Sequence, residues 1–532
     1  MGCDGTRVAV VIEGRPSATV EEDRMGRATV RLDPAFTVGP VRPRMFGSFV
    51  EHMGRCVYTG IYEPGHPAAD ELGFRTDVAE LVRELGVTLV RYPGGNFVSN
   101  YRWEDGVGPK ADRPRQLDLA WRSVETNQVG TDDFVDWARR VGVEPMMAVN
   151  LGTRGLQDAV DLLLYCNARP GTRLPDQRVA NGHVEPHDIR VWCLGNELDG
   201  LWQIGHKTAE EYARVAEETA RAMRQVDGRV ELVACGSSNR AMPTFGTWER
   251  VVLERCFDLV EHISAHAYYE PVDGDVDSFL AAGEDMHRFI EAVVATADHV
   301  AAVKGSDKRV MVSFDEWNVW YHSRFPGERS LEIREAPELI EDVYDVRDAV
   351  VVGSLLITLL QHADRVSMAC QAQLVNVIAP ILTRPGGPAW RQTIFHPFAL
   401  TARYARGTVL RPAVVSDRVE TRAYGPVDAV VVTATHDPES GDLTVFVVNR
   451  SRTESSELTL DVAPPVGGDP TAYVLVEHLV VHDEDPSATN TEERPHRVTP
   501  HPGDAAVDGA TLTATLPATS WHCIRLTERG VR

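Results

Sequence analysis

Short apolar segments alternate with helix-forming segments over most of the chain, and this alternation restricts the fold more than any other feature. The apolar segments are continuous, which is typical of parallel strands covered on both faces. We expect eight strands, at residues 45–50, 88–92, 145–150, 191–195, 230–235, 262–266, 310–314 and 367–371.

The segments between these strands carry helix signals. The clearest helices are expected at residues 131–140, 207–226, 279–303 and 346–360. Eight strands alternating with helices predict an α/β protein with a (β/α)8 TIM barrel at residues 41–404. A doubly wound open sheet is the alternative, and the absence of a Gly-x-Gly-x-x-Gly motif after the first strands argues against it.

The pattern changes after the predicted barrel. Residues 405–532 carry short strands of alternating polarity, punctuated by Gly, Pro, Asp and Ser, and no helix pattern. This predicts a C-terminal antiparallel β-sandwich of jelly-roll type, with residues 482–501 as an exposed loop. Residues 25–40 also alternate and are expected to join the sandwich. Residues 1–24 are expected to form an N-terminal extension with no assigned role.

Composition narrows the classes of partner. The net charge of −24, from 54 Lys and Arg against 78 Asp and Glu, would repel nucleic acids and anionic membranes and suits a neutral substrate such as a sugar. None of the eight cysteines forms a Cys-x-x-Cys pair, so neither a disulfide framework nor a metal site is expected. We find no signal-peptide pattern and no membrane-spanning apolar segment. We therefore expect a cytoplasmic protein.

Two of the apolar segments lead directly into a glutamate. Residues 192–197 read Trp-Cys-Leu-Gly-Asn-Glu and residues 313–318 read Ser-Phe-Asp-Glu-Trp-Asn. Catalytic side chains of TIM barrels lie at the carboxyl ends of the strands. Glu197 and Glu316 are therefore expected to form a carboxylate pair, which is the minimal machinery for hydrolysing a glycosidic bond.

Longer blocks around these strand ends resemble one family. Phe46-Gly-Ser-Phe-Val-Glu-His-Met-Gly, Arg91-Tyr-Pro-Gly-Gly-Asn, Gly195-Asn-Glu and Asp315-Glu-Trp-Asn resemble the family 51 α-L-arabinofuranosidases. The resemblance extends from about residue 25 to the carboxyl end, with the blocks in the same order.

The resemblance implies roles for ten residues and a homohexameric assembly. Glu197 matches the general acid/base and Glu316 the nucleophile. The expected substrate-binding residues are Glu51, Asn96, Asn196, Tyr268 and Gln373 around the sugar ring, Arg91 near the nucleophile, and Trp121 and Trp320 lining the cleft.

The chemistry requires the same residue types. Glu316 must be ionised to attack the anomeric carbon, and Arg91 and the Tyr268 hydroxyl would favour its charged form. Glu197 must hold a proton until the glycosidic bond breaks. His52, His266 and His322 lack tight ligand spacing, so we expect hydrogen-bonding roles for these histidines, with no metal and no cofactor.

The main hypothesis is a retaining, exo-acting α-L-arabinofuranosidase of L-arabinose metabolism that acts on arabino-oligosaccharides by double displacement. One alternative is another furanosidase, or a xylan- or glucan-active hydrolase, on the same fold. A second alternative is a non-catalytic sugar-binding protein, which would have little reason to keep both Glu197 and Glu316.

Overall fold

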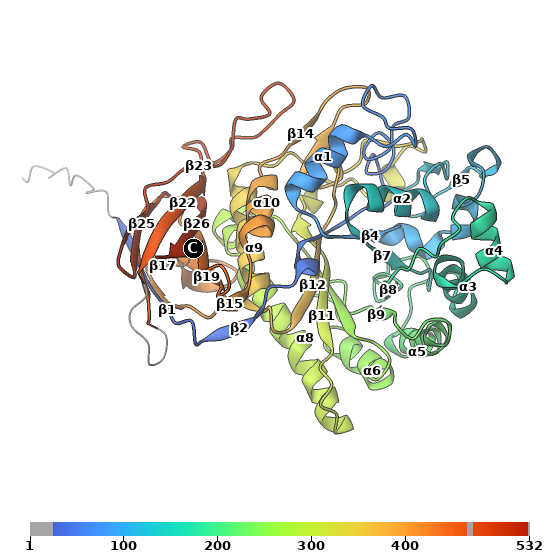
Figure 1. Ribbon diagram of the computed structural model, residues 1–532, viewed down its shortest axis with the longest axis horizontal. Helices are drawn as coiled ribbons and strands as arrows, with labels where there is room; N and C mark the ends of the chain where they lie inside the picture. The colour runs from blue at the N-terminus through green and yellow to red at the C-terminus, as the bar shows by residue number, and fades with distance from the viewer. Residues whose placement is uncertain (1–24, 465–471, 530–532) are drawn as a thin grey trace, which may run out of the picture.

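The computed structural model describes residues 25–464 and 472–529, so the predicted extension at residues 1–24 lies outside the described part. Within it, a closed parallel barrel and a two-sheet domain lie side by side (Figure 1). The barrel strands are β3 (Gly47–Phe49), β4 (Leu89–Tyr92), β7 (Glu144–Ala148), β8 (Val191–Leu194), β9 (Glu231–Ala234), β10 (His262–Tyr269), β11 (Met311–Val319) and β12 (Val366–Gln371). The predicted (β/α)8 barrel is confirmed.

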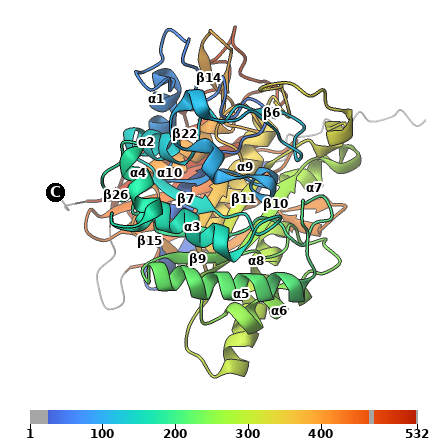
Figure 2. The same cartoon turned by 90° about the vertical axis from the view of Figure 1, so that its right-hand side faces the viewer.

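Helices surround the barrel (Figure 2). They are α1 (Thr76–Leu85), α2 (Thr131–Val141), α3 (Leu156–Asn167), α4 (Arg173–Ala180), α5 (Ala209–Val226), α6 (Thr247–Cys256), α7 (Val276–Leu280), α8 (Gly283–Lys304), α9 (Val346–Gln361) and α10 (Phe395–Tyr404). The start of α5 illustrates the local cause: the Thr208 hydroxyl accepts from the backbone N–H of Glu211, whose carboxylate accepts from the backbone N–H of Thr208. This capping box stabilises the first turn.

Helix α9 is buried on nearly all sides because it contacts both domains. It packs against β11 and β12 of the barrel and against β19 (Val430–Asp437), β20 (Asp442–Asn449) and β26 (Ser520–Glu528) of the two-sheet domain. Its sequence therefore lacks the polar face of an ordinary surface helix.

Several predicted strand bounds were wrong. The first strand begins at Gly47, since residues 43–46 form a short 3-10 helix, η1 (Pro43–Phe46). Strands β10 and β11 continue to Tyr269 and Val319, beyond the predicted ends, so Glu316 lies within β11 and not after it. The register shifts between Ser264 and His266 in β10, and bulges of this kind re-aim side chains without ending a strand.

The C-terminal domain is a sandwich of two mainly antiparallel sheets, as expected. One sheet contains β16 (Ala413–Ser416), β1 (Gly26–Leu32), β21 (Ser456–Val462), β25 (Thr511–Leu516) and β24 (Ala506–Asp508). The other contains β2 (Thr37–Pro40), β15 (Thr408–Leu410), β19, β20, β26, β22 (Tyr473–Val481) and β23 (His501–Pro502). Strand β1 pairs antiparallel with β16 and parallel with β21.

Three two-stranded ribbons complete the described strands: β5 (Gln116–Leu117) with β6 (Val124–Glu125), β13 (Ile381–Thr383) with β14 (Ala389–Arg391), and β17 (Arg418–Thr421) with β18 (Gly425–Asp428). The segment at residues 482–501 is not a wholly exposed loop, because Ala488, Asn490 and Val498 are buried and the Val498 carbonyl accepts from His396.

No helix among residues 25–464 and 472–529 is long and apolar enough to cross a membrane.

Candidate active site

A cavity of about 460 Å³ lies at the carboxyl ends of the barrel strands. Eight of the ten residues expected in the site line it: Glu51, Asn96, Trp121, Glu197, Tyr268, Glu316, Trp320 and Gln373. The other two, Arg91 and Asn196, do not line the cavity and are joined by a hydrogen bond. The structure therefore brings all ten into one region, although they come from distant parts of the chain.

Glu316 is held from two sides. The Arg91 guanidinium donates to its Oε1 at 2.6 Å, and the Tyr268 hydroxyl donates to its Oε2 at 2.8 Å. Burial raises the pKa of the Glu316 carboxyl, while the charges of His266 and Arg91 act in the opposite direction. These contacts favour the ionised form that a nucleophile needs and fix both oxygens in place.

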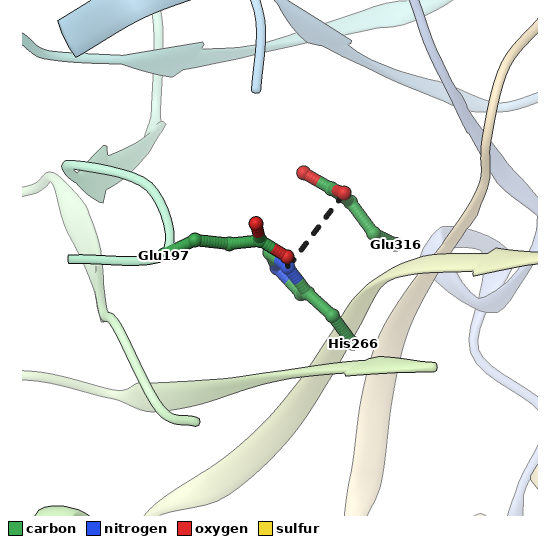
Figure 3. Close-up of side chains that lie close together, drawn as sticks. All are labelled: Glu197, His266 and Glu316. Carbon is green, nitrogen blue, oxygen red and sulfur yellow. Dashed lines mark hydrogen bonds and ion pairs between the residues drawn. The ribbon is translucent and has the colours of Figure 1, made fainter. Parts of the chain in front are cut away.

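Glu197 occupies a tight turn directly after β8. Its own φ of 43° and the φ of 94° at Gly195 lie in the left-handed region, which non-glycine residues adopt at a cost. Trp202 Nε1 donates to Glu197 Oε2 at 2.8 Å, and His266 Nδ1 lies 2.8 Å from Glu197 Oε1. The turn and these two contacts direct the carboxyl group toward Glu316 (Figure 3).

His266 links the two glutamates to a third carboxylate. Its Nε2 lies 2.9 Å from Asp315 Oδ1, and its Nδ1 lies 3.7 Å from Glu316 Oε2. Although burial works against the charged form, the surrounding carboxylates raise the pKa of His266 to about 10. A cationic imidazole is therefore expected between the carboxylates at neutral pH, which reduces their mutual repulsion.

The carboxyl groups of Glu197 and Glu316 are close. An oxygen of each, with one nitrogen of His266, lies within a set of atoms no more than 4.8 Å apart. Such a set could hold a metal ion. Here both ring nitrogens of His266 already contact carboxylates, so the group is satisfied by ion pairs alone.

Glu51 is buried at the side of the cavity. It accepts from the backbone N–H of Phe97 and from Trp121 Nε1, both at 2.9 Å, and from Gln373 Nε2 at 3.1 Å. Burial raises the pKa of Glu51 to about 8. A Cβ at position 95 would lie 2.6 Å from Glu51 Oε2, so the second glycine of the Pro-Gly-Gly-Asn block leaves room for this carboxyl group.

The sequence does not predict the contacts of Trp202 and Asp315, and it predicts only part of the role of His266. Trp202 is 48% exposed at the cavity mouth, and its only sequence signal is its position shortly after Glu197. Asp315 precedes the expected nucleophile in the Asp-Glu-Trp-Asn block, and the sequence indicates no separate role for it. His266 was expected only to form hydrogen bonds and instead connects three carboxylates.

A (β/α)8 barrel with two facing carboxyl groups on its carboxyl side is the arrangement of a glycoside hydrolase. Sequence comparison agrees: the family model of the α-L-arabinofuranosidase 1 domain matches residues 81–285, and that of the α-L-arabinofuranosidase C-terminal domain matches residues 315–520. The chain belongs to the family 51 α-L-arabinofuranosidases.

Individual relatives cover almost the whole chain. An intracellular exo-α-(1→5)-L-arabinofuranosidase of Streptomyces lividans is 60% identical, over 94% of this chain and 75% of its own length. A protein of the same name from Halalkalibacterium halodurans is 51% identical, over 94% of this chain and 99% of its own. The structure of a family 51 α-L-arabinofuranosidase from Bifidobacterium longum superposes with a TM-score of 0.90 at 50% identity, over 94% of this chain and all of the other.

Proposed function

We propose that this protein is a retaining, exo-acting α-L-arabinofuranosidase that removes single terminal arabinofuranosyl residues from arabino-oligosaccharides. The observation that carries the proposal is that one oxygen of Glu197 lies within 4.8 Å of one oxygen of Glu316. Retaining glycosidases place their carboxyl groups about 5–5.5 Å apart, whereas inverting enzymes need about 6.5–9.5 Å to admit water.

In the first step Glu316 attacks the anomeric carbon while Glu197 gives its proton to the departing oxygen. Arg91 and Tyr268 hold Glu316 in place for the attack. The arabinofuranosyl ester that forms removes the negative charge of Glu316. Glu197, now ionised, takes a proton from water, and the water attacks the anomeric carbon and releases arabinose with its original configuration.

Five residues are proposed to hold the furanose ring: Glu51, Asn96, Asn196, Tyr268 and Gln373. Asn196 Nδ2 is buried and has no hydrogen-bond partner among the described residues, while its Oδ1 accepts from Arg91 at 2.6 Å. An unpaired buried donor costs free energy unless a ligand satisfies it. We assign this donor to the sugar hydroxyl next to the anomeric carbon.

Trp121 and Trp320 are proposed to line the cleft for the substrate. They border the cavity together with Tyr268, and the Trp320 ring meets the Tyr268 ring edge-on at 5.3 Å. Glu197 and Glu316 both line this one cavity. A single cavity suits a terminal sugar residue better than the middle of a polymer. We therefore expect slow action on intact polysaccharide.

The relatives bear on linkage and location. The Streptomyces lividans relative is named as an intracellular exo-α-(1→5)-L-arabinofuranosidase, whereas a Bifidobacterium longum relative that is 53% identical is named as an exo-α-(1→6)-L-arabinofuranosidase. We propose a cytoplasmic enzyme, and the linkage is to be determined with both disaccharides. Assembly as a homohexamer is a further proposal, which light scattering of the purified protein would check.

The experiment follows early turnovers on an arabino-oligosaccharide by proton NMR and chromatography. Retained anomeric configuration and arabinose as the first product are expected. Inverted product would contradict the role of Glu316, and an early ladder of internal fragments would contradict exo action. Activity should be unchanged after EDTA treatment, since the proposed steps use no metal.

A further inference from the structure

A second cavity of about 550 Å³ lies at the opposite end of the barrel. It is bordered by residues at or near the amino ends of several strands, including Glu231 of β9, His262 of β10 and Met311 of β11, and by residues of η1. The proposed catalytic residues lie at the carboxyl ends, so this cavity takes no part in the proposed reaction.

Two buried polar side chains in this cavity lack partners. His262 is 5% exposed and Ser367 is 8% exposed, and both line the cavity. Neither His262 Nδ1 nor Ser367 Oγ forms a hydrogen bond within the described part of the chain. Leaving such groups unsatisfied costs free energy, so an occupant that accepts hydrogen bonds is expected in the cavity.

The charges around the cavity indicate the sign of that occupant. Its three carboxylates already have arginine partners: Arg44 binds Glu144 and Glu231 at 2.6 and 2.8 Å, and Arg224 binds Glu261 at 2.6 Å.

Three further cations line the cavity, namely Arg42, Lys308 and Arg309. None of them has a carboxylate within 4.0 Å among residues 25–464 and 472–529, although Arg42 donates to the Ala363 carbonyl. A concentration of unpaired positive charge is unusual in a chain of net charge −24 and attracts anions.

We propose that this cavity binds a small tetrahedral oxyanion, either inorganic phosphate or the phosphate group of a small metabolite. Lys308 and Arg309 supply the charge, while Ser367 and His262 donate hydrogen bonds. Arginine, lysine and hydroxyl groups are the usual partners of phosphate oxygens. The cavity is much larger than a phosphate ion, which leaves room for an attached sugar.

The pKa shifts of His262 and Lys308 support the binding of an anion. Burial, together with the nearby Arg44 charge, lowers the pKa of His262 to about 3. The imidazole is therefore neutral at physiological pH and presents one N–H donor. Burial also lowers the pKa of Lys308. A bound anion would raise both values, because it favours the charged forms.

The test measures thermal unfolding of the full-length protein in inorganic phosphate and in chloride at equal ionic strength. Phosphate should raise the unfolding temperature with a saturable concentration dependence, as expected for a ligand of the folded state. The double variant Lys308→Gln/Arg309→Gln should lose at least tenfold in phosphate affinity. These residues are partly or fully exposed, so the variant should fold.

The matched control is Lys304→Gln at the end of α8, a cation that does not line the cavity. It should bind phosphate normally. Ser367→Ala removes one uncharged donor and should weaken binding severalfold without changing the net charge. Loss of binding in the control as well, or unchanged binding in both test variants, would overturn the proposal.

Ribose 5-phosphate separates the two sources of the anion. Tighter binding than inorganic phosphate would assign the cavity to a phosphorylated sugar, and equal binding would assign it to the free ion. No saturable effect of either probe would mean that the cavity holds only water and would also overturn the proposal.

Discussion

Glu197 and Glu316 are chemically identical side chains in different surroundings. Glu316 contacts a guanidinium and a phenol, whereas Glu197 contacts an indole N–H and an imidazole. Environment sets the task of a carboxyl group. The proposed division into nucleophile and acid/base therefore rests on these contacts, and variants at the two positions should fail in different ways.

Glu197→Ala should lose about 10²–10⁴-fold in rate on oligosaccharides, whose leaving groups need a proton. It should still form the ester from aryl arabinofuranosides with good leaving groups, and azide should restore its turnover. Glu316→Ala should lose activity on both substrates, because no covalent intermediate can form. Steady-state kinetics of both variants on both substrates, with and without azide, measures these losses and the rescue.

Glu270→Gln is the control for these variants, because Glu270 lines the same cavity but bonds to Ser323 and to neither glutamate. It should retain most activity. Equal losses in the Glu197 and Glu316 variants on every substrate would contradict the division of labour.

Glu51 links the site to the pH dependence of stability. Its pKa is raised from about 4.5 to about 8, so between these values the folded protein holds a proton that the unfolded chain releases. The free energy of unfolding contributed by Glu51 therefore falls as the pH rises through this interval. Glu51→Gln removes the titration, so the stability of this variant relative to the parent should be roughly 2–4 kcal/mol higher at pH 8 than at pH 5.

Thermal unfolding of Glu51→Gln and the parent at pH 5 and pH 8 checks this prediction. Glu328→Gln, at the mouth of the same cavity and partly exposed, should leave the difference between the two pH values unchanged. A stabilisation of equal size at both pH values would show that Glu51 titrates normally.

At the scale of elements, local pattern predicted the existence of each barrel strand but not where β10 and β11 end. Their last residues, including Tyr268 and Glu316, are polar or aromatic and are held by pairing between the two strands, with register shifts on the way. Such pairing depends on a neighbouring strand and leaves no periodic signal. For the same reason the contact between His266 and Asp315 could not be predicted.

The turn after β8 is expected to position Glu197. Gly195 has a φ of 94°, and a Cβ there would lie 2.9 Å from Leu198 Cδ1. Gly195→Ala should therefore displace Glu197, lower kcat at least about tenfold and destabilise the protein by about 1–3 kcal/mol. Gly228→Ala is the control, because its nearest neighbour would be 3.9 Å away. Kinetics and unfolding of both variants test whether the turn positions the acid.

At the scale of the molecule, one face of the sandwich shares a hydrophobic core with the barrel, while the interior of the sandwich forms a second core. Phe446, Val448, Trp521 and Cys523 of the sandwich belong to the same buried cluster as the barrel and α9. The sequence predicted both domains, but it could not show this continuity, because α9 reads only as an apolar helix. Because this interface between the domains is large and hydrophobic, we expect the barrel and the sandwich to unfold together.

Gly353 of α9 packs closely against Trp521 of the sandwich. Alanine in a helix interior normally stabilises by roughly 0.5–1 kcal/mol relative to glycine. A Cβ at Gly353 would lie 2.0 Å from Trp521 Cδ1, and Trp521 is fully buried, so its ring cannot move away cheaply. Overpacking costs about 1–3 kcal/mol or more, and we expect it to outweigh the helical gain.

Gly353→Ala should therefore lower the unfolding temperature of barrel and sandwich in a single transition, whereas Gly65→Ala, which meets no atom within 4 Å, should not. Combining Gly353→Ala with Trp521→Phe should recover part of the loss, because the smaller ring makes room for the methyl group. Calorimetry distinguishes the outcomes. Two separate transitions in the Gly353→Ala variant would show that α9 does not couple the domains. No recovery in the double variant would show that the clash with Trp521 does not cause the loss.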